Sequence, residues 1–184
     1  PKYHPDLDAL FAGVLRADPS GLLALLEGSQ RYATELLRRR FQRTLADVLD
    51  RVIFLPAQDG PDYARLLSLA DVLLDTVHYS AGLTAYDAFS LGLPIVTLPG
   101  EFGLGRYTLG CCRKMGIDEL VAAGPEQYVR LAVRLGTDRE YRRWVCAQII
   151  ERSEVLFDDV EAVREHEEFF EYALSRAVEV GTPA

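Results

Sequence analysis

The apolar residues of the sequence fall into two patterns, which predict short strands alternating with helices. Uninterrupted apolar runs are typical of parallel strands buried on both faces, and apolar residues that recur every three or four positions are typical of amphipathic helices. The runs predict strands at Leu22–Leu26, Val52–Leu55, Val72–Leu74, Ile95–Leu98 and Leu120–Val121. The recurring positions predict helices over Leu7–Leu15, Gln30–Phe41, Asp62–Ala70, Leu83–Leu91, Arg106–Met115, Glu126–Leu135, Arg139–Arg152 and Val160–Val178.

This alternation predicts the fold class. Because parallel strands need a crossover between them, the pattern indicates βαβ units and a Rossmann-like, doubly wound parallel α/β sheet. The 184 residues suffice for one such domain, and no internal repeat or low-complexity linker divides them. We therefore expect one domain over residues 1–184, with a C-terminal helix at 160–180 and a frayed Gly-Thr-Pro-Ala tail. The opening Pro1-Lys2-Tyr3-His4-Pro5 has no initiator Met, so we expect a fragment of a larger protein.

Composition narrows the range of partners. The net charge of −8 would repel both nucleic acid and an anionic membrane. No apolar run approaches the roughly 20 residues that span a bilayer, and no signal-peptide pattern opens the chain. The spacing of Cys111, Cys112 and Cys146 suits neither a metal clamp nor an easy disulfide, which favours reduced thiols in or near the core. We expect a cytoplasmic protein without nucleic-acid or membrane partners.

The end of the third predicted strand carries the first candidate site. Asp75–Asp87 combines a glycine turn at Gly82 with the start of a helix, where unpaired N–H groups and a positive dipole end attract anions. Thr84 adds a hydroxyl in the first helical turn. These features indicate a pyrophosphate cradle. An ordinary strand–turn–helix connection explains them equally well.

The end of the fourth predicted strand carries the second candidate site. In the segment Thr97–Arg106, several glycines free the backbone, Arg106 offers a forked donor to a phosphate, and Glu101 offers acceptors to sugar hydroxyls. The alternative is an exposed loop with surface charges. The sequence contains neither a dinucleotide-binding fingerprint nor a P-loop.

Other candidates rest on a single residue type. Lys2 follows a proline at the expected end of a truncated strand, where its ammonium could reach a phosphate or simply be solvated. His78 has the pKa range of a general base, but a lone histidine after a buried strand is more often structural. Asp75 and Asp87 could form a carboxylate pair, or Asp87 could anchor the preceding loop.

Leu69–Thr76, Gly82–Asp87 and Gly92–Glu101 form a specific combination of segments. Together they resemble the C-terminal catalytic lobe of the O-linked N-acetylglucosamine transferase family, which includes SPINDLY-type O-fucosyltransferases and bacterial cytoplasmic N-glycosyltransferases. The runs His78–Ser80 and Met115–Ala122 look closest to the bacterial branch. The similarity covers residues 1–152, most of the chain.

The resemblance implies the GT-B architecture, in which two Rossmann-like lobes face each other across a cleft. The C-terminal lobe of such enzymes holds the nucleotide diphosphate sugar, with UDP-linked hexose the expected donor here. The implied reaction is an inverting transfer to a protein side chain, without a metal or other cofactor. The missing N-terminal region would supply much of the acceptor site, so the isolated fragment should bind nucleotide but transfer nothing.

The resemblance also assigns roles by position. Lys2 matches the family lysine that contacts the diphosphate and is the expected catalytic residue. Leu83 and Thr84, which follow Gly82, match paired threonines at the same phosphates, and Asp87 matches an aspartate associated with the ribose. Further positions match residues that line the base or lie in the loop after the Pro-Gly pair: Gln58, Tyr63, Leu66, Glu101 and Arg106.

The sequence departs from the family pattern at three places. Ala81-Gly82 replaces a Gly-Gly or Gly-His pair, Leu83 replaces the first threonine, and Gly60 stands where the animal enzymes have a base-stacking lysine. These departures leave two alternatives open: a degenerate, non-catalytic GT-B-like interaction module, or a GT-B transferase that acts on lipid or polysaccharide.

Overall fold

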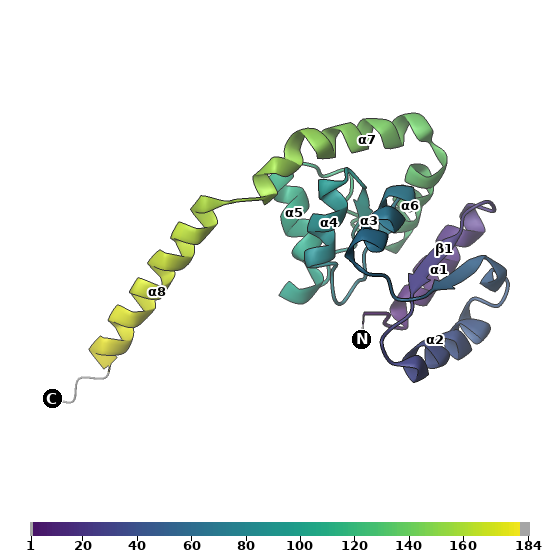
Figure 1. The fold of residues 1–184 in the computed structure, drawn as a ribbon, viewed down its shortest axis with the longest axis horizontal. Helices are drawn as coiled ribbons and strands as arrows, with labels where there is room; N and C mark the ends of the chain where they lie inside the picture. The colour runs from purple at the N-terminus through teal and green to yellow at the C-terminus, as the bar shows by residue number, and fades with distance from the viewer. Residues whose placement is uncertain (1, 181–184) are drawn as a thin grey trace.

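Figure 1 shows the computed structural model, which describes residues 2–180. Its strands are β1 (Leu23–Leu26), β2 (Val52–Leu55), β3 (Leu73–Leu74) and β4 (Ile95–Val96). Its helices are α1 (Asp6–Ala17), α2 (Arg31–Thr44), α3 (Gly60–Leu69), α4 (Leu83–Ser90), α5 (Tyr107–Met115), α6 (Pro125–Thr137), α7 (Arg139–Arg152) and α8 (Val160–Val180). Short 3-10 turns are η1 (Leu49–Arg51), η2 (Gly103–Gly105) and η3 (Ser153–Leu156). The predicted frayed tail lies outside the described residues.

The strands form two separate parallel ladders. β1 pairs with β2 along its whole length, and β3 pairs with β4, with Leu73 opposite Ile95. The predicted strand at Leu120–Val121 is reduced to one parallel bridge between Thr97 and Val121. β4 is shorter than predicted because Thr97 turns to this neighbour, and its N–H donates to the Leu120 carbonyl at 3.0 Å. The five predicted strand positions are otherwise confirmed.

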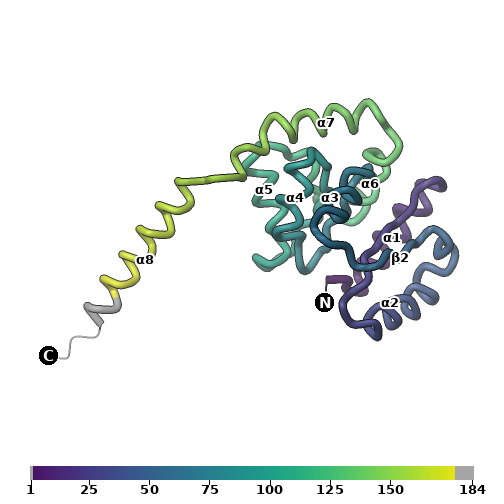
Figure 2. Tube along the Cα trace, viewed as in Figure 1, coloured from purple at the N-terminus to yellow at the C-terminus, as the bar shows by residue number. Residues whose placement is uncertain are grey.

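Helices cover the strands on two sides, as the Rossmann-like prediction requires. A helix lies between each pair of successive strands, so neighbouring strands run parallel. α1 packs against α2 and α6, whereas α4 packs against α3, α5 and α7 (Figure 2). β4 contacts both α4 and α6, so the strands lie between the two helix groups. The doubly wound α/β fold is therefore confirmed.

Local capping explains where several helices begin and end. α3 begins at Gly60, two residues before the predicted start, because the Asp59 side chain accepts a hydrogen bond from the Asp62 N–H at 3.0 Å. α7 has the predicted bounds, and the Asp138 side chain caps it in the same way. α5 ends at Gly116, whose φ of 65° is a left-handed conformation that glycine adopts without strain.

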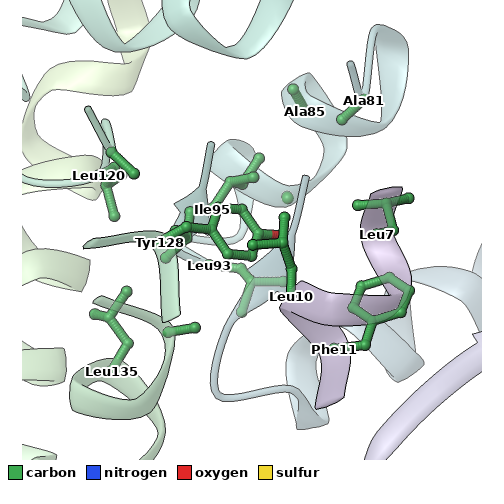
Figure 3. Close-up of a cluster of buried hydrophobic side chains, with 14 of the residues drawn as sticks. Leu7, Leu10, Phe11, Ala81, Ala85, Leu93, Ile95, Leu120, Tyr128 and Leu135 are labelled. Atoms are coloured by element: carbon green, nitrogen blue, oxygen red, sulfur yellow. The ribbon is translucent and has the colours of Figure 1, made fainter. Parts of the chain in front are cut away.

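The core lies between the strands and the two helix groups (Figure 3). The labelled side chains come from α1, the turn before α4, α4 itself, β4 and the residue pair before it, the segment before α6, and α6: Leu7, Leu10, Phe11, Ala81, Ala85, Leu93, Ile95, Leu120, Tyr128 and Leu135. Tyr128 is fully buried, and its hydroxyl donates to the Asp75 backbone carbonyl at 2.8 Å. The core therefore reaches directly beneath the end of β3.

Helix α8 projects away from the rest of the molecule (Figure 1). It follows Asp158, whose φ is 50°, and an ion pair between Lys114 and Asp159 ties its base to α5. Phe169 and Phe170 on this helix are exposed. Among the described helices, none combines the length and the apolar character needed to cross a membrane.

Candidate functional site

A glycine turn at Gly82 joins β3 to α4. Its φ of 58° and ψ of −129° lie in a region that residues with a side chain rarely adopt. The N–H groups of Thr84 and Ala85 donate to the carbonyls of Ala81 and Gly82, at 3.2 and 2.9 Å, so the first turn of α4 is closed on itself. The N–H groups of Gly82 and Leu83 have no partner among the described residues. They are the donors that this helix start offers to an anion.

A buried carboxylate holds this turn in place. The Asp75 side chain accepts hydrogen bonds from the Ser80 hydroxyl at 2.7 Å, the Ala81 N–H at 2.8 Å and the Thr97 hydroxyl at 2.7 Å. A carboxylate that accepts this many bonds can be buried without a cation beside it. Asp75 thereby fixes the loop that leads into Gly82.

The structure corrects the sequence-based interpretation of this loop. Asp87 was expected either to pair with Asp75 or to anchor the loop, but Asp87 is exposed on α4 while Asp75 makes the anchoring bonds. The available signal was a carboxylate directly after a buried strand and before Ser80-Ala81-Gly82, because such a carboxylate faces the hydroxyl and N–H groups of its own turn.

The second predicted site packs directly against the first. The Ser80 N–H donates to the Leu104 carbonyl at 2.8 Å. An added Cβ on Gly100 or Gly105 would lie 2.9 or 2.8 Å from the Val77 carbonyl oxygen, closer than real Cβ contacts come. Both glycines are therefore required by the close approach of the two loops, and the structure brings the two predicted strand ends together.

Lys2 lies beside the Gly82 turn. Its Nζ is 3.5 Å from the Ala81 carbonyl oxygen and 5.0 Å from the centre of the Tyr79 ring. A cation at this distance from an aromatic face is attracted by it. The structure therefore places an ammonium group at the residue before Gly82, in the turn that leads into α4.

Three predicted site residues meet where α3 packs against α4: Tyr63 on α3, and Thr84 and Asp87 on α4. Burial raises the pKa of Tyr63 above its usual range, and the negative charge of Asp87 raises it further, while a hydrogen bond with Thr84 opposes both effects. Burial and the nearby Tyr63 also raise the pKa of Tyr3. Two aromatic rings thus lie beside the phosphate cradle, in an environment where both hydroxyls stay protonated at neutral pH.

An open cavity of about 960 Å³ runs from this cradle into the space between the two ladders. Its lining includes the predicted site residues Lys2, Tyr63, Leu66 and Thr84, together with Tyr3 and Ala81. It also includes apolar strand residues of both ladders, such as Leu23, Leu25, Leu73 and Leu74. The Lys2 ammonium and the Thr84 hydroxyl are suited to an anionic ligand, whereas the apolar strand residues are not.

Comparison with known proteins identifies the family. The sequence profile of glycosyl transferase family 41 matches residues 2–164. The chain belongs to this family. It is 30% identical over 159 residues to the UDP-N-acetylglucosamine--peptide N-acetylglucosaminyltransferase of Caenorhabditis elegans, and 27% identical over 146 residues to the SPINDLY protein of Arabidopsis thaliana. These alignments cover 85% and 74% of the chain but only 14% and 15% of the relatives' own length.

A solved structure supports the same assignment. A variant of the Thermobaculum terrenum O-GlcNAc transferase superposes with a TM-score of 0.84 at 25% identity, covering 98% of this chain and 35% of the other. The resemblance to the O-GlcNAc transferase and SPINDLY family is therefore confirmed, as is the Rossmann-like lobe of the GT-B fold.

The remaining predicted residues of this family 41 lobe are not among those that line the cavity: Gln58, Gly82, Leu83, Asp87, Glu101 and Arg106. The Arg106 guanidinium donates to the Gly100 carbonyl at 2.8 Å and so closes its own loop. The Gln58 amide donates to the Pro56 carbonyl at 2.7 Å. The Leu83 side chain is 82% exposed, so its contribution to the cradle is its backbone N–H.

Proposed function

We propose that this chain is the donor-binding lobe of an inverting, cytoplasmic glycosyltransferase that moves a sugar from a nucleotide diphosphate to a protein side chain. A UDP-linked sugar is the proposed donor, because relatives across 74–85% of this chain carry names that specify UDP-N-acetylglucosamine and a peptide. The chain spans about a seventh of those relatives, so the acceptor site is assigned to the rest of the protein.

One observation carries this proposal. The Lys2 ammonium lies 3.5 Å from the carbonyl oxygen of Ala81, in the same turn as Gly82 and Leu83, whose N–H groups have no partner among the described residues. Among the described residues, this ammonium makes a long contact with a neutral carbonyl and lies over the ring of Tyr79. A diphosphate would replace that neutral carbonyl with an oppositely charged acceptor, which adds the attraction between the two charges.

The chemistry follows from this arrangement. The acceptor nucleophile attacks the anomeric carbon, the bond from that carbon to the diphosphate oxygen breaks, and the proton of the nucleophile passes to a base outside this lobe. Lys2 and the helix-start N–H groups then stabilise the charge that grows on the departing diphosphate. They supply the positive charge themselves, so we propose that transfer needs no metal cofactor.

The altered threonine pair is compatible with this role. Leu83 lacks a hydroxyl but retains the N–H group, which is the donor that the geometry presents. The Thr84 hydroxyl donates to the Ala81 carbonyl at 2.5 Å, so it must rotate to donate to a phosphate. We expect Thr84 to contribute less to donor affinity than Lys2.

Titration calorimetry of the chain with UDP tests the site. Lys2→Ala should weaken UDP binding by at least tenfold and Thr84→Ala by several fold, since a hydrogen bond to a charged group contributes about 1.5–3 kcal/mol. Lys114→Ala is the matched control, because Lys114 pairs with Asp159 at the base of α8. Binding should persist in EDTA. Unchanged UDP affinity in both cradle variants would exclude this site, and no binding of UDP- or GDP-sugars would favour a non-catalytic module.

A further inference from the structure

Two histidines and an aspartate meet where the N-terminal segment touches the β3–α4 loop. His78 Nε2 lies 2.8 Å from Asp6 Oδ2, and His4 Nδ1 lies 3.3 Å from the same oxygen. The three ligand atoms all lie within 4.8 Å of one another, and all three side chains are exposed. The imidazole rings are edge-to-face, with centres 4.5 Å apart.

Two groups of Asp6 lie close to the same ring nitrogen of His4. The Asp6 backbone nitrogen and the Asp6 Oδ2 atom are each 3.3 Å from His4 Nδ1. An imidazole nitrogen has one lone pair, so a bound metal ion would take the place of the long contact with the backbone N–H. A positive charge between Nδ1 and the carboxylate oxygen, from a proton or a metal ion, makes their close approach favourable.

We propose that His4, Asp6 and His78 bind a divalent transition-metal ion of the Zn²⁺ class. Two imidazoles and one carboxylate, with further positions open to water, are a ligand set typical of such ions. Ligand atoms at about 2.0–2.1 Å from a tetrahedral ion are about 3.3 Å apart, which is the His4–Asp6 spacing. The His78–Asp6 spacing needs to open only by about half an ångström.

The bound ion acts as a clamp and takes no part in sugar transfer. It connects the segment that follows Lys2 to the loop that precedes Gly82, and thus holds the two parts of the proposed cradle together. The site stands on its three ligands alone and does not depend on the proposed function.

Calorimetric titration of the chain with Zn²⁺, without nucleotide, tests the proposal. We expect one ion per chain and at least a tenfold loss of affinity in His78→Ala and in Asp6→Asn. His166→Ala is the matched control, since His166 lies on α8 and hydrogen-bonds to the Ala162 carbonyl. Co²⁺ should give a visible spectrum without the charge-transfer band of a thiolate ligand. The absence of binding up to about 100 µM, an equal loss in His166→Ala, or a thiolate band would overturn the site.

Discussion

The hydroxyl of Tyr128 donates a 2.8 Å hydrogen bond to the backbone carbonyl of Asp75, and the Asp75 side chain in turn holds the turn that leads to Gly82. A fully buried residue of α6 is thereby connected to the candidate phosphate cradle through a single residue, Asp75. The position of the cradle therefore depends on the core and not only on its own loop.

Removal of the Tyr128 hydroxyl should destabilise the protein. In Tyr128→Phe the buried Asp75 carbonyl loses this donor, so the free energy of unfolding should fall by about 1–3 kcal/mol. Urea denaturation measures the change. Tyr172→Phe on exposed α8 is the control and should have no measurable effect. Equal stability of the two variants would show that the bond contributes nothing net.

Asp75→Asn should lower the stability of the protein more than the same substitution does at an exposed aspartate. The amide keeps one acceptor oxygen but presents an NH₂ group where hydroxyl and N–H donors converge, so we expect a loss of about 2–4 kcal/mol. UDP affinity should fall as well, because the Ala81 N–H loses its anchor. Asp62→Asn, at an exposed ion pair with Arg65, should change stability by less than about 1 kcal/mol. Retention of stability in Asp75→Asn would contradict the anchoring role.

Glycine substitutions should separate backbone strain from helix propensity. Gly82→Ala forces a side chain into φ 58°, ψ −129°, which costs about 1–3 kcal/mol. Gly110→Ala, inside α5 with nothing within 4 Å of the added Cβ, should be stabilising by about 0.5–1 kcal/mol. In thermal denaturation, the midpoint temperature should therefore fall for Gly82→Ala and rise for Gly110→Ala.

Alkaline pH should destabilise the fold through Cys112. Burial, and then the neighbouring Cys111, raise the pKa of its thiol from 9.0 to about 12. Above pH 9 the unfolded chain loses this proton while the folded chain keeps it, so the stabilising contribution is complete below pH 9 and is lost as the pH rises towards 12. The loss reaches at most about 1.4 kcal/mol per pH unit. Cys112→Ala should show a shallower decline than the unmodified chain, and an identical pH slope would contradict the assignment.

Much of the fold was predictable because it depends on local patterns. The apolar runs around Leu23 and Ile95 identify buried strands. The turn residue Asp59 explains why α3 starts two residues before the predicted bound, and Gly116 explains why α5 ends at Met115, as predicted. Strand pairing was harder to predict from the sequence. Thr97 leaves β4 for a single bridge to Val121, which depends on the packing of distant segments.

The location of the candidate site could be predicted from the sequence, but the hydrogen bonds that hold it in place could not. Gly82 and Lys2 were singled out from residue type, and Lys2 contacts Ala81, the residue before Gly82. The anchoring role of Asp75 depends on Thr97, which lies 22 residues further along the chain, and on a core tyrosine 53 residues away. The His4–Asp6–His78 trio likewise joins segments about 70 residues apart, which no local motif could reveal.

The close approach of Gly100 and Gly105 to the Val77 carbonyl limits which positions of this loop can be substituted. A side chain at either glycine would collide with backbone, whereas an added Cβ at Gly103 meets nothing within 4 Å. Substitutions are thus tolerated at the tip of the loop, which carries Glu101 and Phe102, and barred at its base. Selection can therefore diversify the groups at the tip of the loop while the backbone that places them stays unchanged.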